Sequence, residues 1–390
     1  MKLLSLLQGH RAEDQIGFHQ SGVQLVHEGL LEDYRAVPFL GADRQPSRNP
    51  VFDEILETAK SLRPDFVFFQ YFHFHQIPDP SLLIQNLRQT LPRAVFFVSS
   101  GDSFGRWTRR LPASLIQASR AVDLTFLSGM GYVADDLVGR GGQRIALMPH
   151  GFCPVRFSSA QRPYEGFRLE GEVVCVASNY RVHNPLSYLY RHKKARVEEI
   201  RALGHRYGKK FALFGRGWEG FTGWRGPLPY EKQGELFRGA RVVVGGHPGG
   251  SMDYYLSDRE FIAMASGTPF VEHWTPRVET LFRPGEHWYL YRNEQEMIRT
   301  IDRLLGEPAG AAKARATQTE AYLRSKHSQY HRLKEMLRIA KEYGECRGDG
   351  RGYLPKLEFF LPEVDWSREK RFALRGWGPD PGRFPKKTRQ

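Results

Sequence analysis

Short apolar runs alternate with amphipathic stretches along the first 150 residues of the chain. The amphipathic stretches, such as residues 52–59, repeat apolar side chains at intervals of three and four, which is the spacing of a helix lying on a sheet. Regular β–α alternation predicts a parallel, doubly wound sheet with ligand-binding loops at the carboxyl ends of its strands. The expected strands are the apolar runs at residues 3–7, 36–39, 65–69, 94–99, 123–127 and 145–148.

A polar stretch without periodicity interrupts this alternation at residues 158–170, and we interpret it as a linker. A second β–α series then begins, which predicts a second doubly wound sheet. Its expected strands are residues 173–176, 211–214, 242–244, 270–272 and 288–291. The predicted α/β organisation is a first domain at 1–157, the linker at 158–170, a second domain at 171–312, a helix at 313–345 and a basic aromatic tail at 346–390.

A length of 390 residues suits two α/β domains with an appendage. The longest apolar runs, at residues 66–69 and 95–98, are far shorter than the roughly 20 residues of a membrane span. Residues 1–7 resemble a signal peptide, but polar residues follow at once, so we interpret them as the first buried strand. The 3 cysteines are widely spaced and odd in number, which indicates a reducing, cytoplasmic compartment.

The formal net charge of +14 is large and attracts polyanions such as nucleotide diphosphates, anionic lipid surfaces or nucleic acid. The positive charge is concentrated at residues 106–110, at residues 191–196 and in the tail after residue 347. Each cluster is also compatible with an ordinary solvated surface. Charge alone therefore leaves the class of partner open.

Residues 257–271 combine charge, a short helix, a glycine turn and a strand. Asp258, Arg259 and Glu260 occupy the first turn of the expected helix, where unpaired backbone N–H groups hold polar ligands. Gly267 is a typical helix end, and Phe270 begins a buried strand. The pattern favours a ligand-binding unit, although an ordinary helix end with solvated charges has the same appearance.

This segment resembles the donor-binding motif of GT-B glycosyltransferases of the group 1 kind, and most closely the branch that includes the spore-maturation glycosyltransferases. Arg259, Phe261 and Gly267 match the family's Arg-x-Phe-Glu segment and its later glycine. Residues 242–248 resemble a strand that ends in a histidine-containing loop, and residues 327–332 resemble the C-terminal histidine- and arginine-containing element. The first half of the chain matches this family in pattern only.

The resemblance implies a GT-B fold, with two Rossmann-like doubly wound domains facing a cleft, followed by a C-terminal helix and a basic tail. It implies an N-terminal acceptor domain, a C-terminal donor domain and glycosyl transfer from a UDP-, GDP- or dTDP-sugar, with no tightly bound cofactor. It also implies a retaining, metal-independent reaction. In this chain Ile262 stands where the family has a glutamate that binds the donor ribose. Either Glu260 replaces that glutamate or the donor contact differs, and a non-catalytic nucleotide-sugar or polyanion-binding module is the alternative.

Loops after the second-domain strands supply the cations and backbone N–H groups that a diphosphate leaving group requires. Arg181 and Arg216 are the leading diphosphate cations because a planar guanidinium matches phosphate oxygens in pairs, and Arg196 is an alternative. His247 matches the histidine of the family's loop. The full expected donor-binding set is Asn179, Arg181, Arg196, Arg216, His247, Asp258, Arg259 and Glu260.

The loops after the first and fourth strands place His10 and Asp102 at the expected cleft. We interpret both as catalytic candidates, with Asp102 as acid/base or acceptor-orienting group, although capping of a helix explains Asp102 equally well. No histidine or carboxylate spacing indicates a metal site. The acceptor is expected to be a glycan or small molecule. DNA with hydroxylated bases is the alternative, gripped by Arg106, Trp107, Arg109 and Arg110, and peripheral membrane contact is a further possibility.

Overall fold

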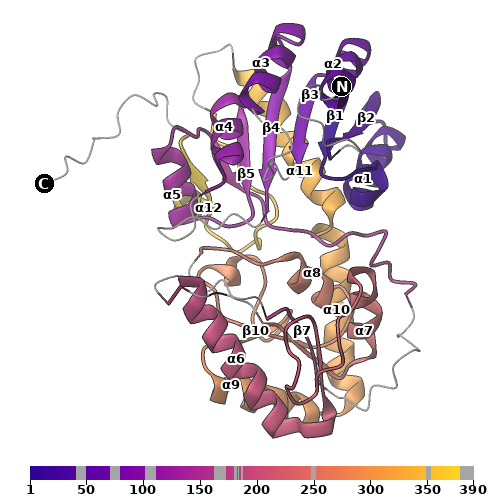
Figure 1. Cartoon of the computed structure of the whole chain (residues 1–390), viewed down its shortest axis with the longest axis vertical. Helices are drawn as coiled ribbons and strands as arrows, with labels where there is room; N and C mark the ends of the chain where they lie inside the picture. The colour runs from indigo at the N-terminus through magenta and orange to yellow at the C-terminus, as the bar shows by residue number, and fades with distance from the viewer. Residues whose placement is uncertain are drawn as a thin grey trace, which may run out of the picture.

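The computed structural model describes residues 1–40, 50–70, 80–101, 111–161, 173–179, 182, 184–185, 188–246, 252–347 and 353–377. Two α/β units lie one above the other in Figure 1, the N-terminal unit at the top and the second unit below it. The long helix α11 (Gln329–Cys346) rises from the lower unit into the upper one. Among the helices described, none has the length and apolar character needed to cross a membrane.

The N-terminal unit is built on a parallel sheet to which one short antiparallel strand is added. In spatial order, the strands described are β12 (Leu374–Arg375), β6 (Ile145–Leu147), β5 (Leu124–Leu127), β4 (Val95–Ser100), β3 (Phe66–Gln70), β1 (Lys2–Leu7) and β2 (Asp33–Pro38). The helices are α1 (Ile16–His27), α2 (Pro50–Leu62), α3 (Pro80–Thr90), α4 (Ala113–Ala121) and α5 (Tyr132–Gly139), with a short 3₁₀ turn, η1 (Ala12–Gln15).

The two faces of this sheet are buried by different helices. Leu3 of β1 joins one core with Phe18 of α1 and Leu333 of α11. Leu4, the next residue along the strand, joins the opposite core with Ile55 of α2. Both faces of β1 are therefore buried, which explains why leucines occupy adjacent positions along it rather than alternating with polar residues.

The second unit is a smaller parallel sheet. In spatial order, its strands are β11 (Tyr289–Tyr291), β10 (Phe270–His273), β9 (Val242–Val244), β7 (Val173–Val176) and β8 (Phe211–Phe214). Its helices and 3₁₀ turns are α6 (Tyr188–Tyr207), η2 (Gly208–Lys210), η3 (Tyr230–Lys232), α7 (Gln233–Gly239), α8 (Asp258–Met264), η4 (Val278–Thr280), α9 (Glu294–Gly306) and α10 (Ala309–Lys326). The predicted α/β class with two doubly wound sheets is confirmed.

The single helix expected at residues 313–345 is instead two helices, α10 and α11, separated at His327 and Ser328. Ser328 caps α11, and its hydroxyl lies 2.8 Å from Nδ1 of His331. Arg332 holds the break in place, because its guanidinium lies 2.6 Å from Nδ1 of His327 and donates to the carbonyl of His150 at 3.1 Å. Beyond the break, α11 rises into the N-terminal unit and packs against α1.

Part of the expected C-terminal tail packs against both units. Phe359 and Phe360 are buried, and β12 pairs antiparallel with β6 of the N-terminal sheet. Between them, Glu369 of α12 (Trp366–Ala373) accepts a hydrogen bond from Tyr254 and forms an ion pair of 3.1 Å with Arg277, both of the second unit. Residues 353–377 are therefore a strap across the two units rather than a free extension.

Candidate donor-binding site

The order of strands in the second sheet marks a crevice. β7 has β8 on one side and β9 on the other, so the connections that leave β7 and β9 run in opposite directions. Ligands of doubly wound proteins bind at this point, outside the carboxyl ends of the strands. A pocket of about 520 Å³ opens beside β7 at this end of the sheet, and we call it the strand-end pocket. It is lined by Val176, Ala177, Ser178, Gly215, Arg216, Pro227, Leu228, Pro229, Gln233 and Arg259.

The floor of the strand-end pocket is formed by two loops in close contact. Gly215 has a φ of +135°, and a Cβ atom there would lie 1.9 Å from the carbonyl oxygen of Ala177, so this position requires glycine. Trp218 is fully buried and its indole N–H donates to the same carbonyl at 2.7 Å. Asn179 links the loops again, since its side-chain amide donates to the carbonyl of Gly217 at 2.8 Å. The loop after β7 is therefore fixed against the loop after β8.

Three arginines approach this end of the sheet from different elements. Arg196 of α6 is buried and donates to the carbonyl of Ser178 at 2.7 Å. Arg259, in the first turn of α8, is half-buried and lines the strand-end pocket, while Arg216 is exposed at its rim. Burial lowers the pKa of Arg259, but nearby Glu260 and Asp258 outweigh that effect and raise it overall. The arginines remain charged, and a planar guanidinium suits phosphate oxygens.

Two carboxyl groups are fully buried behind the arginines. Glu260 of α8 accepts a hydrogen bond from the hydroxyl of Ser257 at 2.6 Å, and Glu272 of β10 accepts one from the backbone N–H of His273 at 2.8 Å. The other oxygen of each, Oε1 of Glu260 and Oε2 of Glu272, has no hydrogen-bond partner. Burial raises the pKa of Glu272 well above its usual range, and the charge of Glu260 raises it further. Burial also raises the pKa of Glu260, with Arg259 opposing the shift.

Two further titratable groups border this cluster. Burial raises the pKa of Glu199 to about 7, although the hydroxyl of Tyr291 donates to its carboxylate at 3.0 Å and opposes the change. Burial also raises the pKa of the Cys175 thiol to about 12, so this cysteine is a neutral core residue. Within the part of the chain that the structure describes, no group of three or more His, Cys, Asp or Glu side chains is arranged to hold a metal ion.

Residues 191–338, which include Arg196, Arg216, Arg259 and both buried glutamates, match a family model described as glycosyl transferase-like. Sucrose-phosphate synthase from Thermosynechococcus elongatus aligns with a TM-score of 0.55 at 13% identity, over 89% of this chain and 100% of that one. Anabaena HepE in complex with UDP and glucose aligns with a TM-score of 0.54 at 12% identity, over 88% and 100%.

This chain has the GT-B fold and a glycosyl transferase-like region. The trehalose-6-phosphate protein from E. coli bound with UDP-2-fluoro glucose also aligns, with a TM-score of 0.52 at 11% identity, over 88% of this chain and 99% of that one. Comparison with curated protein sequences gave no match. The predicted GT-B fold is therefore confirmed, and residues 191–338 are similar to the glycosyl transferase-like family.

The structure describes some of the predicted donor-site residues and not others. Arg216 and Arg259 line the strand-end pocket, and Arg196 and Asn179 fix the loop beside it. Asp258 accepts a hydrogen bond from the hydroxyl of Tyr230 at 2.7 Å, which ties α8 to η3. The predicted residues that lie outside the described part of the chain are Asp102, Arg106, Trp107, Arg109, Arg110, Arg181 and His247.

His10, the remaining catalytic candidate, is exposed after β1 of the N-terminal unit. Its backbone N–H donates to Asp14 at 2.8 Å, so the backbone of this loop is anchored and the imidazole is left in solvent. Sequence reasoning missed Glu272, because a single acidic residue at the end of an apolar run was interpreted as the last residue of a strand. The available signal was that a charge directly follows Phe270 and Val271, both buried here.

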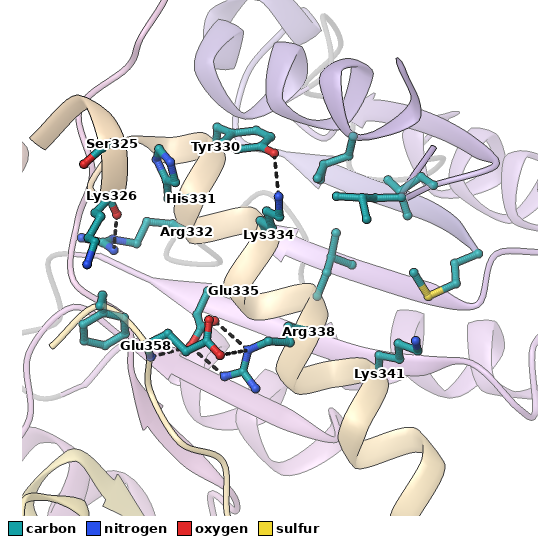
Figure 2. Close-up of a pocket in the computed structure, with 16 residues that line it drawn as sticks. Ser325, Lys326, Tyr330, His331, Arg332, Lys334, Glu335, Arg338, Lys341 and Glu358 are labelled. Atoms are coloured by element: carbon teal, nitrogen blue, oxygen red, sulfur yellow. Dashed lines mark hydrogen bonds and ion pairs between the residues drawn. The ribbon is translucent and has the colours of Figure 1, made fainter. Parts of the chain in front are cut away.

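A second depression lies along α11, away from the strand ends, and Figure 2 shows its lining. We call this depression of about 650 Å³ the α11 groove; it runs between α11 and the turn after α1. Three of its cations already face carboxylates: Arg338 lies 2.8 Å from Glu335 (Figure 2), Lys334 lies 3.8 Å from Glu28, and Lys341 forms an ion pair with Glu345. Much of the positive charge along the α11 groove is therefore already paired.

Proposed function

We propose that this protein is a glycosyltransferase that moves a sugar from a nucleotide-sugar donor to an acceptor hydroxyl. The observation that carries the proposal is the strand-end pocket, where Arg216 and Arg259 meet at the topological switch point of the second sheet. A leaving nucleoside diphosphate develops negative charge, which preorganised cations in a partly buried site stabilise. The glycosyl transferase-like match at residues 191–338 covers these two residues.

We propose a UDP-sugar as the donor, bound with its diphosphate against Arg259 and Arg216. Similar structures are described in complex with UDP-glucose and with UDP-2-fluoro glucose. The apolar wall at Pro227, Leu228 and Pro229 suits the planar base, while the arginines face the phosphates. GDP- and dTDP-sugars are the alternatives that a comparison of donors will separate.

For the acceptor we propose a glycan or another small hydroxyl-bearing molecule, reached from the N-terminal unit. His10 and Asp102 remain the candidates for the transfer step, and Asp102→Asn tests the second. We propose a metal-independent, retaining reaction, in line with a similar structure described in terms of glycosyl transfer with retention. No contact among the described residues favours DNA as the acceptor, so the cluster at residues 106–110 remains a sequence-based prediction.

Calorimetric titration of UDP, GDP and dTDP tests the donor site. Arg259→Ala is expected to weaken UDP binding by about 1.5–3 kcal/mol, which is the contribution of a hydrogen bond to a charged group. Arg299→Ala is the matched control, because this arginine is exposed on α9 of the same unit. Equal UDP affinity in wild type and Arg259→Ala would show that the strand-end pocket is not the donor-binding site.

Turnover separates an enzyme from a module that only binds the nucleotide sugar. We expect the wild type to release UDP from UDP-sugar slowly without an acceptor and faster with one. Asp102→Asn is expected to slow transfer by about 10²–10⁴-fold if this residue acts as the acid or base. Donor binding without any UDP release, across a panel of sugars and acceptors, would favour the binding module.

A further inference from the structure

We propose that Glu369 of the strap is a positioning residue for the transfer step: it holds residues 252–256 against the N-terminal unit. We call residues 252–256 the junction segment. It runs directly into Ser257 and α8, whose first turn carries Arg259. Glu369 would thereby set the distance between the donor helix and the acceptor side. The inference rests on the proposed function, and Glu369 is not placed in contact with either substrate.

The junction segment touches the carboxyl ends of the N-terminal strands. In the loop after β5, the backbone N–H of Met130 donates to the carbonyl of Asp253 at 2.9 Å. A Cβ atom at Gly129 would lie 2.9 Å from Cβ of Tyr255, so the two backbones are in close contact. Tyr255 is buried, and its ring meets that of His150 edge-on with centroids 6.5 Å apart. The segment before the donor helix therefore lies on the side from which the acceptor is expected.

Two residues at this contact have a left-handed backbone. The φ of Tyr254 is +63° and that of Arg277 is +67°, a region that is costly for residues with a side chain. Tyr254 is fully buried, and its backbone N–H donates to the carbonyl of Pro276 at 2.8 Å, which brings the two positions together. Such conformations persist only where surrounding contacts hold them.

Glu369 contacts both left-handed residues. It accepts a hydrogen bond from the hydroxyl of Tyr254, and its two oxygens lie 3.1 and 3.3 Å from Nη1 of Arg277. The guanidinium also lies 3.8 Å from the carboxylate of Asp253, with its Cζ 3.1 Å from the ring centroid of Phe372 in α12. Hydrogen bonds to a buried carboxylate are strong and directional, so one strap residue fixes both conformations.

The strap connects Glu369 rigidly to the N-terminal unit. α12 leads directly into β12, where Leu374 pairs with Ala146 of β6. The indole N–H of Trp377 donates to the carbonyl of Ile145 at 2.7 Å. Glu369 therefore belongs to the N-terminal unit through its backbone, while its side chain holds residues of the second unit.

Donor binding does not need this contact. Within the second unit, α8 is held by the hydrogen bond of 2.7 Å from Tyr230 to Asp258, and by packing of Phe261 on Phe282 at 5.7 Å between centroids. Transfer is more demanding, because a displacement of about 1 Å between reacting groups can slow a reaction by about 10²-fold. Loss of Glu369 is therefore expected to slow transfer and to leave donor affinity nearly unchanged.

Hydrogen–deuterium exchange without ligand tests the anchoring. Glu369→Gln removes the charge and Tyr254→Phe removes the hydroxyl, and both keep the shape of the side chain. Exchange at residues 128–131 and 252–256 is expected to be at least tenfold faster in Glu369→Gln and about threefold faster in Tyr254→Phe. Glu363→Gln is the matched control, because this strap carboxylate pairs with Arg283 at 2.7 Å, outside the junction segment. Unchanged exchange in Glu369→Gln, or equal acceleration in Glu363→Gln, would overturn the proposal.

Turnover and affinity together test the positioning role. With UDP-glucose as the donor and the acceptor that gives the fastest release of UDP, we expect the maximal rate to fall at least tenfold in Glu369→Gln. Affinity for UDP, measured by calorimetry, is expected to stay within about threefold of wild type. Glu363→Gln is expected to retain both. An unchanged rate in Glu369→Gln, or equal losses of rate and affinity, would contradict a positioning role.

These measurements separate the inference from the proposed function. If the wild type releases no UDP from any nucleotide sugar, the proposed function fails and the role in transfer falls with it, whereas exchange still decides whether Glu369 anchors the junction segment. If the wild type transfers sugar and Glu369→Gln does so equally fast, the proposed function stands and the positioning role is wrong.

Discussion

The two sheets have the same layout but present different chemistry at the carboxyl ends of their strands. In the N-terminal sheet these ends carry buried neutral groups that satisfy one another. Gln70 donates to Gln15 at 2.8 Å, and Ser128 donates to the carbonyl of Gly101. In the second sheet the corresponding region holds Glu260 and Glu272, whose buried carboxyl groups keep oxygens without partners.

This difference distinguishes what a buried strand end needs in order to fold from what a ligand-binding site needs. Parallel strands with buried ends need only hydrogen-bond partners, which neutral hydroxyls and amides provide at low cost. Buried charges are expensive and are retained where a site uses them. We therefore place the donor on the second sheet, and the following predictions test that contrast from the largest expected effect to the smallest.

The largest loss of stability is expected from substitutions in the two closely packed loops under the strand-end pocket. Gly215→Ala forces a Cβ atom to 1.9 Å from a backbone carbonyl at a φ of +135°. We expect at least about 3 kcal/mol of lost stability in chemical denaturation, from backbone strain and overpacking together. Gly306→Ala, where nothing lies within 4 Å of the added atom, is expected to stay within about 1 kcal/mol.

The N-terminal sheet offers a matched position for the same substitution. Gly9 follows β1, and a Cβ atom there would lie 2.7 Å from Cβ of Asp14 and 2.8 Å from the carbonyl oxygen of Arg11. These contacts are longer than the 1.9 Å contact at Gly215, and Gly9 does not have a positive φ, so Gly9→Ala is expected to cost less, about 1–2 kcal/mol. Equal losses at Gly9 and Gly215 would show that the second sheet is no more tightly constrained than the first.

Removing a contact of the strap between the units is expected to have the next largest effect on stability. Glu369→Ala leaves the hydroxyl of Tyr254 without this carboxylate and leaves the guanidinium of Arg277 with the longer, 3.8 Å ion pair to Asp253. Loss of a largely buried hydrogen-bonded charge is expected to cost about 2 kcal/mol in chemical denaturation. Exposed Glu279 of the same unit provides the control, and Glu279→Ala is expected to change stability by less than about 0.5 kcal/mol. A similar effect of both substitutions would mean that the strap does not hold the units together.

The raised pKa of Glu199 is expected to make the stability of the protein depend on pH. Its pKa is raised to about 7 in the folded protein, so the folded state binds more protons than the unfolded state between about pH 4.5 and pH 7. Its contribution to stability therefore falls as pH rises through this window. One pKa unit corresponds to about 1.4 kcal/mol, and after a discount for its partial exposure we expect about 1–2 kcal/mol.

Glu199→Gln is the variant that isolates this effect. Its stability relative to the wild type is expected to improve by that amount as pH rises from 4.5 to 8, measured by urea denaturation at each pH. A constant difference between the two proteins over this range would contradict the raised pKa of Glu199.

The smallest effects are expected in the α11 groove. Lys341→Ala removes an exposed ion pair with Glu345, which contributes little in water. Stability is expected to stay within about 0.5 kcal/mol and UDP affinity to stay unchanged. A clear loss of UDP binding in Lys341→Ala would indicate that the donor binds outside the strand-end pocket.

Sequence reasoning located the strands well because buried parallel strands are continuous apolar runs. Expected strands such as residues 211–214 and 242–244 coincide with β8 and β9. It placed Arg216 after a strand and Arg259 at a helix start, which is where the structure has them, whereas Arg196 was chosen from the family resemblance and lies within α6. Predictions of this kind depend on local sequence patterns, which can be recognised without knowing the tertiary structure.

Features that depend on distant contacts were missed. The break between α10 and α11 is stabilised by Arg332 reaching back to the carbonyl of His150, a contact across the two units. The strap was predicted only as part of a basic aromatic tail at residues 346–390, because the burial of Phe359 and Phe360 depends on contacts that form in the folded chain. Glu272 was hidden because burial of a carboxyl group at a strand end is a property of the assembled sheet.

Hydrogen–deuterium exchange with and without UDP tests most directly that the donor binds the second sheet. We predict that saturating UDP slows exchange in the segments around residues 173–179, 211–217 and 257–264, which surround the strand-end pocket. The segments at residues 1–10 and 95–101 of the N-terminal sheet are predicted to be unchanged. Protection confined to the N-terminal segments, with none around Arg259, would contradict the account.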